Sequence, residues 1–160
     1  MPDVKAMSQV HTYKCRVEWS GSTAAGHSHY DREHSGVSPP AESQLRLSGD
    51  PAFGGNHPEL LNPEQLLVLA ASSCQLLSFL ETAARARIDV LAYTDDAQGI
   101  MPEQDKPLRV TSITLRPHIV VAGGVEEERV RHYVDLAHEG CFIANSIKSE
   151  IAIEPQIELR

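Results

Sequence analysis

The N-terminal third of the chain alternates between larger apolar and polar positions, as half-buried strands do. In residues 9–19 the alternation places five side chains on one face, which is typical of a strand with that face in the core. They are His11, Tyr13, Cys15, Val17 and Trp19. A second, more polar strand is expected over residues 23–33 and a third over residues 43–48, before a loop rich in glycine and proline at residues 49–61.

The clearest local signal is a helix that begins after this loop. Asn62 is a good N-cap, Pro63 suits the first helical position and Gln65 can close a capping box. The helix should end near Arg87 and is apolar around most of its circumference. A helix of this kind is normally buried on all sides. Because one small domain rarely surrounds so long a helix, we expect a partner subunit to cover part of it.

The second half of the chain predicts strands around one more helix. Strands are expected at residues 88–99, 108–121 and 151–159, and the helix should begin near Val125, with three glutamates in its first turn. The order β-β-β-α-β-β-α-β favours an α+β fold in which a mixed or antiparallel sheet packs on two helices. The length suits a single domain covering residues 1–160.

Composition and charge exclude several classes of protein. The net charge of −8 and the pI near 5.4 make nucleic-acid binding an unfavourable assignment. The longest apolar run, Leu66–Leu80, is interrupted by polar residues and is expected not to span a membrane. Residues 1–7 contain no apolar segment typical of a secretory signal. Three cysteines are too few for a disulfide framework, so we expect a reducing compartment, the cytoplasm.

Two of the cysteines stand at positions that attract chemical interest. Cys74 lies in the middle of the apolar helix, and Cys141 follows His138 and Gly140, where the second helix should stop. Taken alone, both positions also suit small buried hydrophobic residues. His138 suits either a group that influences Cys141 or a helix-end histidine that satisfies a carbonyl. Cys15 is expected in the core.

Three histidines lie close together, in the second predicted strand and just after it. They are His27, His29 and His34, and the first two would share one face. Such a pair is compatible with a metal site, but no further ligand spacing supports one. We therefore expect exposed strand histidines and no bound metal.

Two segments resemble the motifs of a known family. The segment 62–67, NPEQLL, followed by Cys74, resembles the first motif of the OsmC/Ohr family of osmotically inducible and organic hydroperoxide resistance proteins. The segment 137–146, AHEGCFIANS, with its histidine three residues before Cys141, resembles the second. The resemblance implies an OsmC-like α+β fold, with a mostly antiparallel sheet on two helices, in an intertwined homodimer with buried central helices.

The same resemblance implies a cysteine-based peroxidase that reduces organic hydroperoxides. Cys74 matches the attacking cysteine and Cys141 the resolving one, so that a sulfenic acid at the first becomes a disulfide with the second. Glu64 matches the glutamate of the first motif, and its arginine partner should come from the second strand. Arg32 is our assignment and Arg46 the alternative. The resemblance suggests a dithiol or lipoyl-bearing reductant and no metal or organic cofactor.

This chemistry requires a means of ionising a buried thiol. Only the thiolate is nucleophilic, and burial in an apolar helix raises the pKa of a cysteine. A cationic neighbour should offset that effect, and a guanidinium can do so while also binding a carboxylate through its fork. Without the resemblance, Glu64 would be interpreted as a helix-capping residue and Arg32 as part of an ordinary surface salt bridge.

The spacing of the first motif leads to a hypothesis about assembly. Glu64 and Cys74 are about 15 Å apart along one helix, further than a glutamate side chain reaches. Either the helix is broken, or the glutamate that serves Cys74 comes from a second subunit. We favour a two-fold dimer with the long helices antiparallel and two sites at the interface.

Some residues depart from the family pattern and leave other functions open. Gln75 stands where an aromatic residue or histidine is more usual, and Phe142 where one branch of the family commonly has proline. The natural peroxide and the reductant are thus undetermined, although Leu77, Phe79 and Phe142 suit either a pocket for fatty or aromatic hydroperoxides or simple core packing. The rival functions are a binding module without turnover and a redox sensor.

Overall fold

The computed structural model describes residues 9–160, so the N-terminal signal region considered above lies outside the described residues. The chain divides into two compact units. The N-terminal unit runs to Pro63 and the C-terminal unit from Glu64 to Arg160, and each is described here by itself.

The N-terminal unit contains a small antiparallel sheet. Its strands, in the order β1-β2-β3, are β1 (Arg16–Glu18), β2 (His34–Val37) and β3 (Leu45–Leu47). A short 3-10 helix, η1 (Pro51–Phe53), follows. The sheet register pairs Val17 with Gly36 and Ser35 with Arg46.

Three expectations for this unit are wrong. Residues 23–33 form turns and bends instead of a strand, because Gly26 adopts a φ of 90° and its N–H bonds back to Thr23 O over 3.0 Å. The predicted strand at residues 9–19 shortens to the three residues of β1. Cys15 is exposed and not in the core, since β1 is exposed along its whole length within this unit.

The predicted helix is confirmed as α1 (Pro63–Arg85). It ends where Arg87 turns into the left-handed region with a φ of 58°. One stripe at intervals of four residues is buried: Ala71, Gln75, Phe79 and Ala83. The other apolar residues are partly buried, as Leu67 and Val68 are, or exposed, so the expectation of burial on all sides is not met within one chain.

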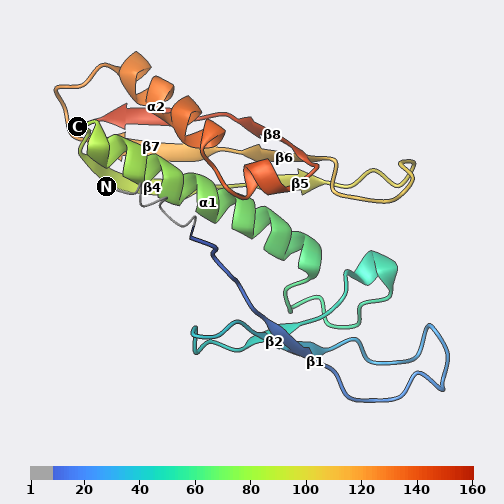
Figure 1. Cartoon of the computed structure of the whole chain (residues 1–160). Helices are drawn as coiled ribbons and strands as arrows, with labels where there is room; N and C mark the ends of the chain where they lie inside the picture. The colour runs from blue at the N-terminus through green and yellow to red at the C-terminus, as the bar shows by residue number, and fades with distance from the viewer. Residues whose placement is uncertain (1–8) are drawn as a thin grey trace, which may run out of the picture. The chain divides into compact units, whose positions relative to one another are not determined.

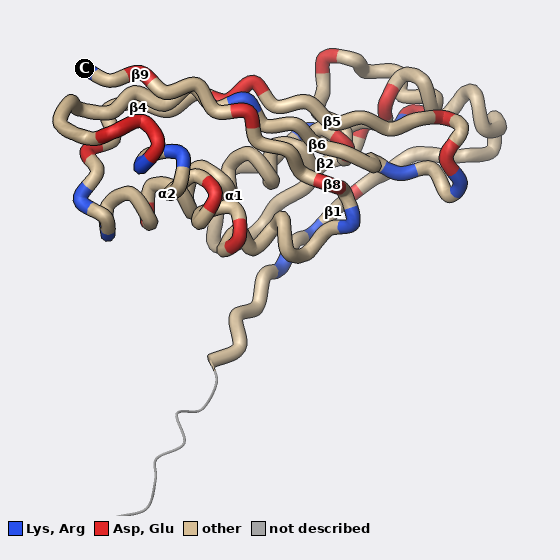
Figure 2. The backbone as a smooth tube through the Cα atoms, turned by 90° about the horizontal axis from the view of Figure 1, so that it is seen from above, with Lys and Arg blue, Asp and Glu red and all other residues tan. Residues whose placement is uncertain are grey.

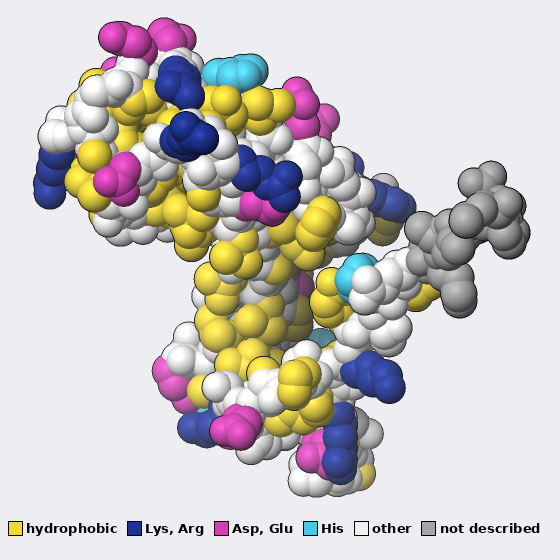
Figure 3. Space-filling view, turned by 60° about the vertical axis from the view of Figure 1, so that its left-hand side comes forward, with side chains coloured by type: hydrophobic (Ala, Val, Ile, Leu, Met, Phe, Trp, Pro, Cys, Tyr) yellow, Lys and Arg dark blue, Asp and Glu magenta, His cyan; other side chains and the backbone are white. Residues whose placement is uncertain are grey.

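Figure 3 shows hydrophobic side chains gathered along the exposed surface of α1. Leu69 and Leu77 are 56% and 64% exposed there. By length and composition alone α1 could cross a membrane, but the central helix of a water-soluble fold passes the same test. The exposed leucines therefore form an apolar surface that is expected to be buried against another surface. Their exposure does not identify that other surface.

The three strands predicted in the second half are present, each divided into two pieces. The pieces are β4 (Val90–Asp95), β5 (Gln98–Ile100), β6 (Ser112–Leu115), β7 (Pro117–Val121), β8 (Glu150–Ile153) and β9 (Gln156–Leu159). They form two three-stranded sheets in the orders β4-β7-β9 and β5-β6-β8, each with one antiparallel and one parallel pair.

Arg116 bridges the break between the two sheets. It separates β6 from β7, its backbone N–H donates to Asp95 Oδ1 over 2.6 Å, and its Nε donates to Glu154 Oε2 over 3.1 Å. Asp95 and Glu154 lie at the corresponding breaks of the neighbouring strands. The interruptions are thus aligned across the three strands and joined by one arginine.

Two helices cover one face of these sheets (Figures 1 and 2). The second is α2 (Glu127–Glu139), and a short 3-10 helix, η2 (Ala144–Ser146), follows it. The main core joins α1, α2 and β7 through fully buried side chains. They include Phe79 and Ala83, Val130 and Val134, and Ile119 and Val121. The α+β class with two helices is confirmed.

Phe79 connects the two helices to the sheet, and its removal tests this core. We expect Phe79→Ala to lower the free energy of unfolding by about 3–5 kcal/mol, because a fully buried aromatic side chain leaves a cavity. Leu91→Ala is the control, since Leu91 is 54% exposed and should cost less than about 1 kcal/mol. Urea unfolding measures both, and equal losses would contradict this description of the core.

Candidate functional site

Cys74 and Cys141 meet in the C-terminal unit. Cys74 lies in the middle of α1, and Cys141 comes directly after the end of α2. The backbone N–H of Ile143 donates to Cys74 Sγ over 3.5 Å, and the two thiols are hydrogen-bonded to each other. Both cysteines are free, with Cys141 buried and Cys74 partly exposed. Two thiols distant in sequence therefore share one site.

The turn after α2 presents the N–H groups that face Cys74. Gly140 ends α2, and the Cys141 N–H bonds back to His138 O over 3.1 Å. Asn145 then closes the turn, with its backbone N–H and its side-chain amide both donating to Cys141 O over 3.0 Å. Because this turn is fixed by its own hydrogen bonds, the Ile143 N–H is held toward the sulfur.

Polar contacts also fix α1 next to Cys74. Gln75, which is buried, donates from Nε2 to Val134 O over 3.1 Å and so links α1 to α2. Ser72 Oγ donates to Asp95 Oδ2 over 2.5 Å, linking α1 to the break in the sheet. Sequence reasoning noted Gln75 only as a departure from a family pattern. An amide in the middle of a largely apolar helix was the available signal of this contact.

The surroundings lower the pKa of Cys74 and raise that of Cys141. Burial by itself raises the pKa of the Cys74 thiol, but hydrogen bonds from the Ile143 N–H, the Cys141 thiol and other neighbours outweigh it and lower the pKa. Burial raises the pKa of Cys141, and the adjacent Cys74 adds to this effect. Cys74 therefore loses its proton first, while Cys141 stays protonated and donates to it.

Cys74 opens into a cavity of about 220 Å³ between α1 and the end of α2. Most of its wall is apolar, and Leu77 and Phe142 are 64% and 79% exposed at its edge. Ser78 and Thr82 add hydroxyl groups, and Glu81 is the single charged side chain in the wall. The cavity is thus suited to a small, largely apolar molecule that approaches the sulfur.

Glu64 lies in the first turn of α1, on the same unbroken helix as Cys74. Ten residues at about 1.5 Å each separate them by roughly 15 Å. The structure therefore removes the possibility of a broken helix. Glu64 does not reach the Cys74 of its own chain, and its role stays a prediction.

Arg32 and Arg46 lie in the N-terminal unit. Arg46 is on β3 and pairs with Glu33, its Nε donating to Oε1 over 2.7 Å. Arg32 is not on a strand, contrary to expectation, but in the loop before β2. Among residues 9–160, no carboxylate forms an ion pair with Arg32, so it is the better of the two candidates for a free guanidinium. Its contact with Cys74 stays a prediction.

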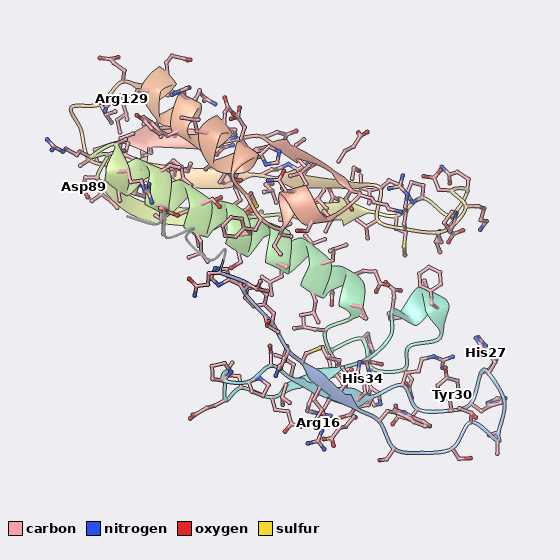
Figure 4. The ribbon with its side chains drawn as sticks, in the orientation of Figure 1. Arg16, His27, Tyr30, His34, Asp89 and Arg129 are labelled. Carbon is pink, nitrogen blue, oxygen red and sulfur yellow. The ribbon has the colours of Figure 1, made fainter. Side chains whose placement is uncertain are left out.

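The three histidines lie at positions that differ from the prediction of a strand. His27 and His29 lie in turns, and His34 is on β2, apart from the turn of His27 (Figure 4). A different group, Asp31, Glu33 and His57, places one ligand atom each within 4.8 Å of one another. His57 Nε2 lies 3.1 Å from Asp31 Oδ1, so ion pairing already accounts for this group, in which Asp31 is exposed and the other two side chains are partly buried. Such a group is common without a metal.

The fold and the paired thiols together define a class of α+β proteins. In this class two helices cover the sheets, and two cysteines, one on the first helix and one directly after the second, share a site. The family model of the OsmC-like proteins matches residues 55–156, more than half of the chain. The chain therefore belongs to the OsmC family. A search of the curated proteins found no match.

Solved structures agree with this assignment. An OsmC-like protein of unknown function from Vibrio cholerae is 31% identical, with a TM-score of 0.82 over 92% of this chain and 100% of its own. An organic hydroperoxide resistance protein from Elizabethkingia anophelis is 17% identical, with a TM-score of 0.70 over 96% of this chain and 100% of its own. The corresponding protein from Bacillus subtilis is 17% identical, with a TM-score of 0.59 over 94% and 98%. The last two show a shared fold.

The hydrogen bonds at the sulfur predict an acidic thiol at Cys74. In a Cys15→Ser, Cys141→Ser variant, which keeps a hydroxyl donor at position 141, we expect Cys74 to titrate below the ordinary cysteine pKa of about 8.5. The initial rate of alkylation by iodoacetamide against pH measures this value. The matched variant that retains only Cys141 should titrate above it. A Cys74 pKa at or above the ordinary value would contradict the described site.

Proposed function

We propose that this protein is a thiol-dependent peroxidase that reduces organic hydroperoxides to alcohols. One observation carries the proposal: the Cys74 sulfur, with a lowered pKa, opens into an apolar cavity while hydrogen-bonded to the protonated Cys141. Membership of the OsmC family supports it, because two structural relatives carry the name of organic hydroperoxide resistance proteins.

The proposed reaction has two steps at these sulfurs. The Cys74 thiolate attacks one peroxide oxygen, so that a sulfur–oxygen bond forms, the oxygen–oxygen bond breaks and the alkoxide leaves to become ROH on protonation. The Cys141 sulfur then attacks the sulfenic acid, forms the disulfide and releases water. Two thiols are oxidised as one hydroperoxide is reduced.

The hydrogen bond between the thiols suits this sequence of steps. Cys141 lies next to Cys74 and needs no large movement to reach it. Its raised pKa keeps it protonated while Cys74 is ionised, so that Cys74 attacks first. The same proton can leave when Cys141 becomes the nucleophile.

Arg32 and Glu64 complete the proposed site. A guanidinium would stabilise the thiolate and the departing oxygen, and a carboxylate would orient the guanidinium. Arg32 is our choice because Arg46 is already paired with Glu33. Because Glu64 is too far from the Cys74 of its own chain, we assign it to the site of a second chain.

The proposed assembly is therefore a homodimer. The exposed leucines of α1 supply an apolar surface of the kind that subunit interfaces bury. An antiparallel pair of α1 helices would cover these leucines and bring Glu64 of one chain toward Cys74 of the other. A dithiol or lipoyl-type reductant would recycle the disulfide in a reducing compartment, for which we propose the cytoplasm.

Single-turnover kinetics test the peroxidase. On mixing with cumene hydroperoxide, the wild type should lose both thiols of the pair to a disulfide, whereas Cys74→Ser should lose neither at an appreciable rate. Cys141→Ser should stop at a sulfenic acid, which dimedone traps and mass spectrometry detects. Arg32→Gln should slow the first step by about 10- to 100-fold, and Arg46→Gln by less than about three-fold.

Two results would overturn the assignment. Undiminished peroxide consumption in Cys74→Ser would remove Cys74 from the reaction. If the wild type reacted with no organic hydroperoxide, its function would instead be that of a binding module without turnover. A fast first turnover without recycling by dihydrolipoamide would instead indicate a redox sensor.

Negative charges introduced on the exposed face of α1 test whether this face forms the proposed dimer interface. We expect Leu69→Glu with Leu80→Glu to convert a dimer into a monomer, because both leucines are exposed in the single chain and a buried charge is costly in an interface. Analytical ultracentrifugation measures the mass, and the hydroperoxide assay should show activity lost with the dimer. Leu91→Glu, on the exposed side of β4, is the control. A fully active wild-type monomer would contradict the shared site.

A further inference from the structure

Ser78 lies one turn of α1 beyond Cys74 and lines the same cavity. Residues four apart on a helix share one face, with their Cβ atoms about 5–6 Å apart. Burial raises the pKa of the Cys74 thiol, and a hydrogen bond between the Ser78 side chain and the sulfur is among the contacts that lower it. A hydroxyl in contact with the reacting atom therefore also stands in the wall past which a substrate approaches.

The other polar side chains of this wall offer no free hydroxyl. Thr82 Oγ1 donates to two backbone carbonyls, over 3.0 Å and 3.4 Å. Glu81 pairs with Arg85 over 2.5 Å, and an ionised carboxylate only accepts hydrogen bonds. Cys141, the other side chain that donates to the sulfur, does not line the cavity. Among the residues that line it, Ser78 thus supplies the only hydroxyl that is not committed to a backbone carbonyl.

Negative charge moves away from the sulfur during the proposed reaction. As the thiolate attacks one oxygen of the hydroperoxide, the sulfur–oxygen bond forms, the oxygen–oxygen bond breaks, and the electron pair leaves on the second oxygen. The backbone N–H of Ile143 cannot follow this charge, because the turn after α2 holds it toward the sulfur. A serine hydroxyl can follow it, because it rotates about its C–O bond and redirects its hydrogen.

We infer that Ser78 is a catalytic residue that donates first to the Cys74 thiolate and then to the leaving oxygen of the hydroperoxide. The inference rests on the proposed function, because the second acceptor exists only when a hydroperoxide is cleaved at the sulfur. Ser78 keeps its own proton: the step yields the Cys74 sulfenic acid and an alkoxide, which takes a proton from water to become the alcohol. The hydroxyl stabilises the alkoxide until that proton arrives.

Electrophiles whose leaving groups differ in basicity test this role. The parent protein carries Cys15→Ser and Cys141→Ser, so that Cys74 is the only thiol of the chain, and it is compared with the same protein carrying Ser78→Ala. Cumene hydroperoxide releases a strongly basic alkoxide, whereas peracetic acid releases acetate, which needs no hydrogen bond to be stable. Stopped-flow mixing at one pH, with dimedone trapping of the sulfenic acid, measures the first step with each.

The Ser78→Ala variant should lose more rate with cumene hydroperoxide than with peracetic acid. We expect a loss of about ten-fold with the first, below the roughly 100-fold that removal of one oxyanion donor can cost, because Arg32 of the proposed site would share the charge. With peracetic acid we expect a loss of less than about three-fold, from a smaller thiolate fraction once the hydrogen bond to the sulfur is removed. Both electrophiles meet the same thiolate, so the ratio of the two losses reports the leaving oxygen alone.

Further variants separate the hydroxyl from the shape of the side chain. Ser78→Thr and Ser78→Val place nearly equal shapes in the wall, and only the first keeps a hydroxyl. The Thr variant should therefore react with cumene hydroperoxide about three-fold or more faster than the Val variant, which keeps the test open if the Ala variant does not fold. Ser73→Ala, the same change at an exposed position of α1 outside the wall, should alter neither rate appreciably. Circular dichroism confirms the fold of each variant.

The outcomes distinguish this inference from the proposed function. Equal losses with the two peroxides in Ser78→Ala, or equal rates of the Thr and Val variants with cumene hydroperoxide, would contradict the role of Ser78 and leave the proposed function standing. If the parent were alkylated by iodoacetamide but did not react with cumene hydroperoxide, the proposed function would be wrong and the inference with it. The parent thus tests the peroxidase, and the variants test Ser78.

Discussion

The hydrogen bond from the Ile143 N–H to Cys74 Sγ is the interaction on which the chemistry of the C-terminal unit depends. A thiol on an apolar helix should resist ionisation, because burial disfavours the charged form. The turn after α2 reverses this effect with neutral donors, whose direction is fixed by the hydrogen bonds of Asn145. In the proposed reaction, a cation at the site would then have another use, to stabilise the peroxide oxygen as its bond breaks.

The position of that turn depends in turn on the packing of α1 against α2. Phe79 and Val134 share one buried core, and the Gln75 amide links the helices beside Cys74. A shift of one helix along the other would move the sulfur away from the N–H groups that stabilise its charge. Fold stability and thiol acidity are for this reason coupled in the same few residues, while the exposed side of α1 is free to serve as an interface.

The sequence allowed most of the C-terminal unit to be predicted and little of the N-terminal loops. Long apolar stretches determined α1 and the three strands, because periodicity over many residues leaves few alternatives. The breaks at Arg116 and its neighbours escaped prediction, since they depend on contacts across strands. The strand expected at residues 23–33 is absent because Gly26, with its φ of 90°, turns the chain there.

For the site, motif resemblance paired Cys74 with Cys141, and the structure places them together. From residue types alone, a cation is expected beside Cys74 to lower the pKa of its thiol. The backbone N–H of Ile143 could not be predicted in this way, because every residue except proline has such a donor. Gln75 was visible as an unusual residue, but its partner is the Val134 carbonyl, which only the fold identifies.

Within the N-terminal unit, the surroundings of the three arginines decide which of them can serve the proposed function. Two of the three arginines in the N-terminal unit are neutralised by nearby acids, and the third is held between Tyr30 and a glycine loop without one. A guanidinium kept free in this manner could bind Glu64 of a second chain in a bidentate manner, as the proposed function requires. The same unpaired charge therefore distinguishes Arg32 from Arg16 and Arg46 as the guanidinium of the proposed cysteine site.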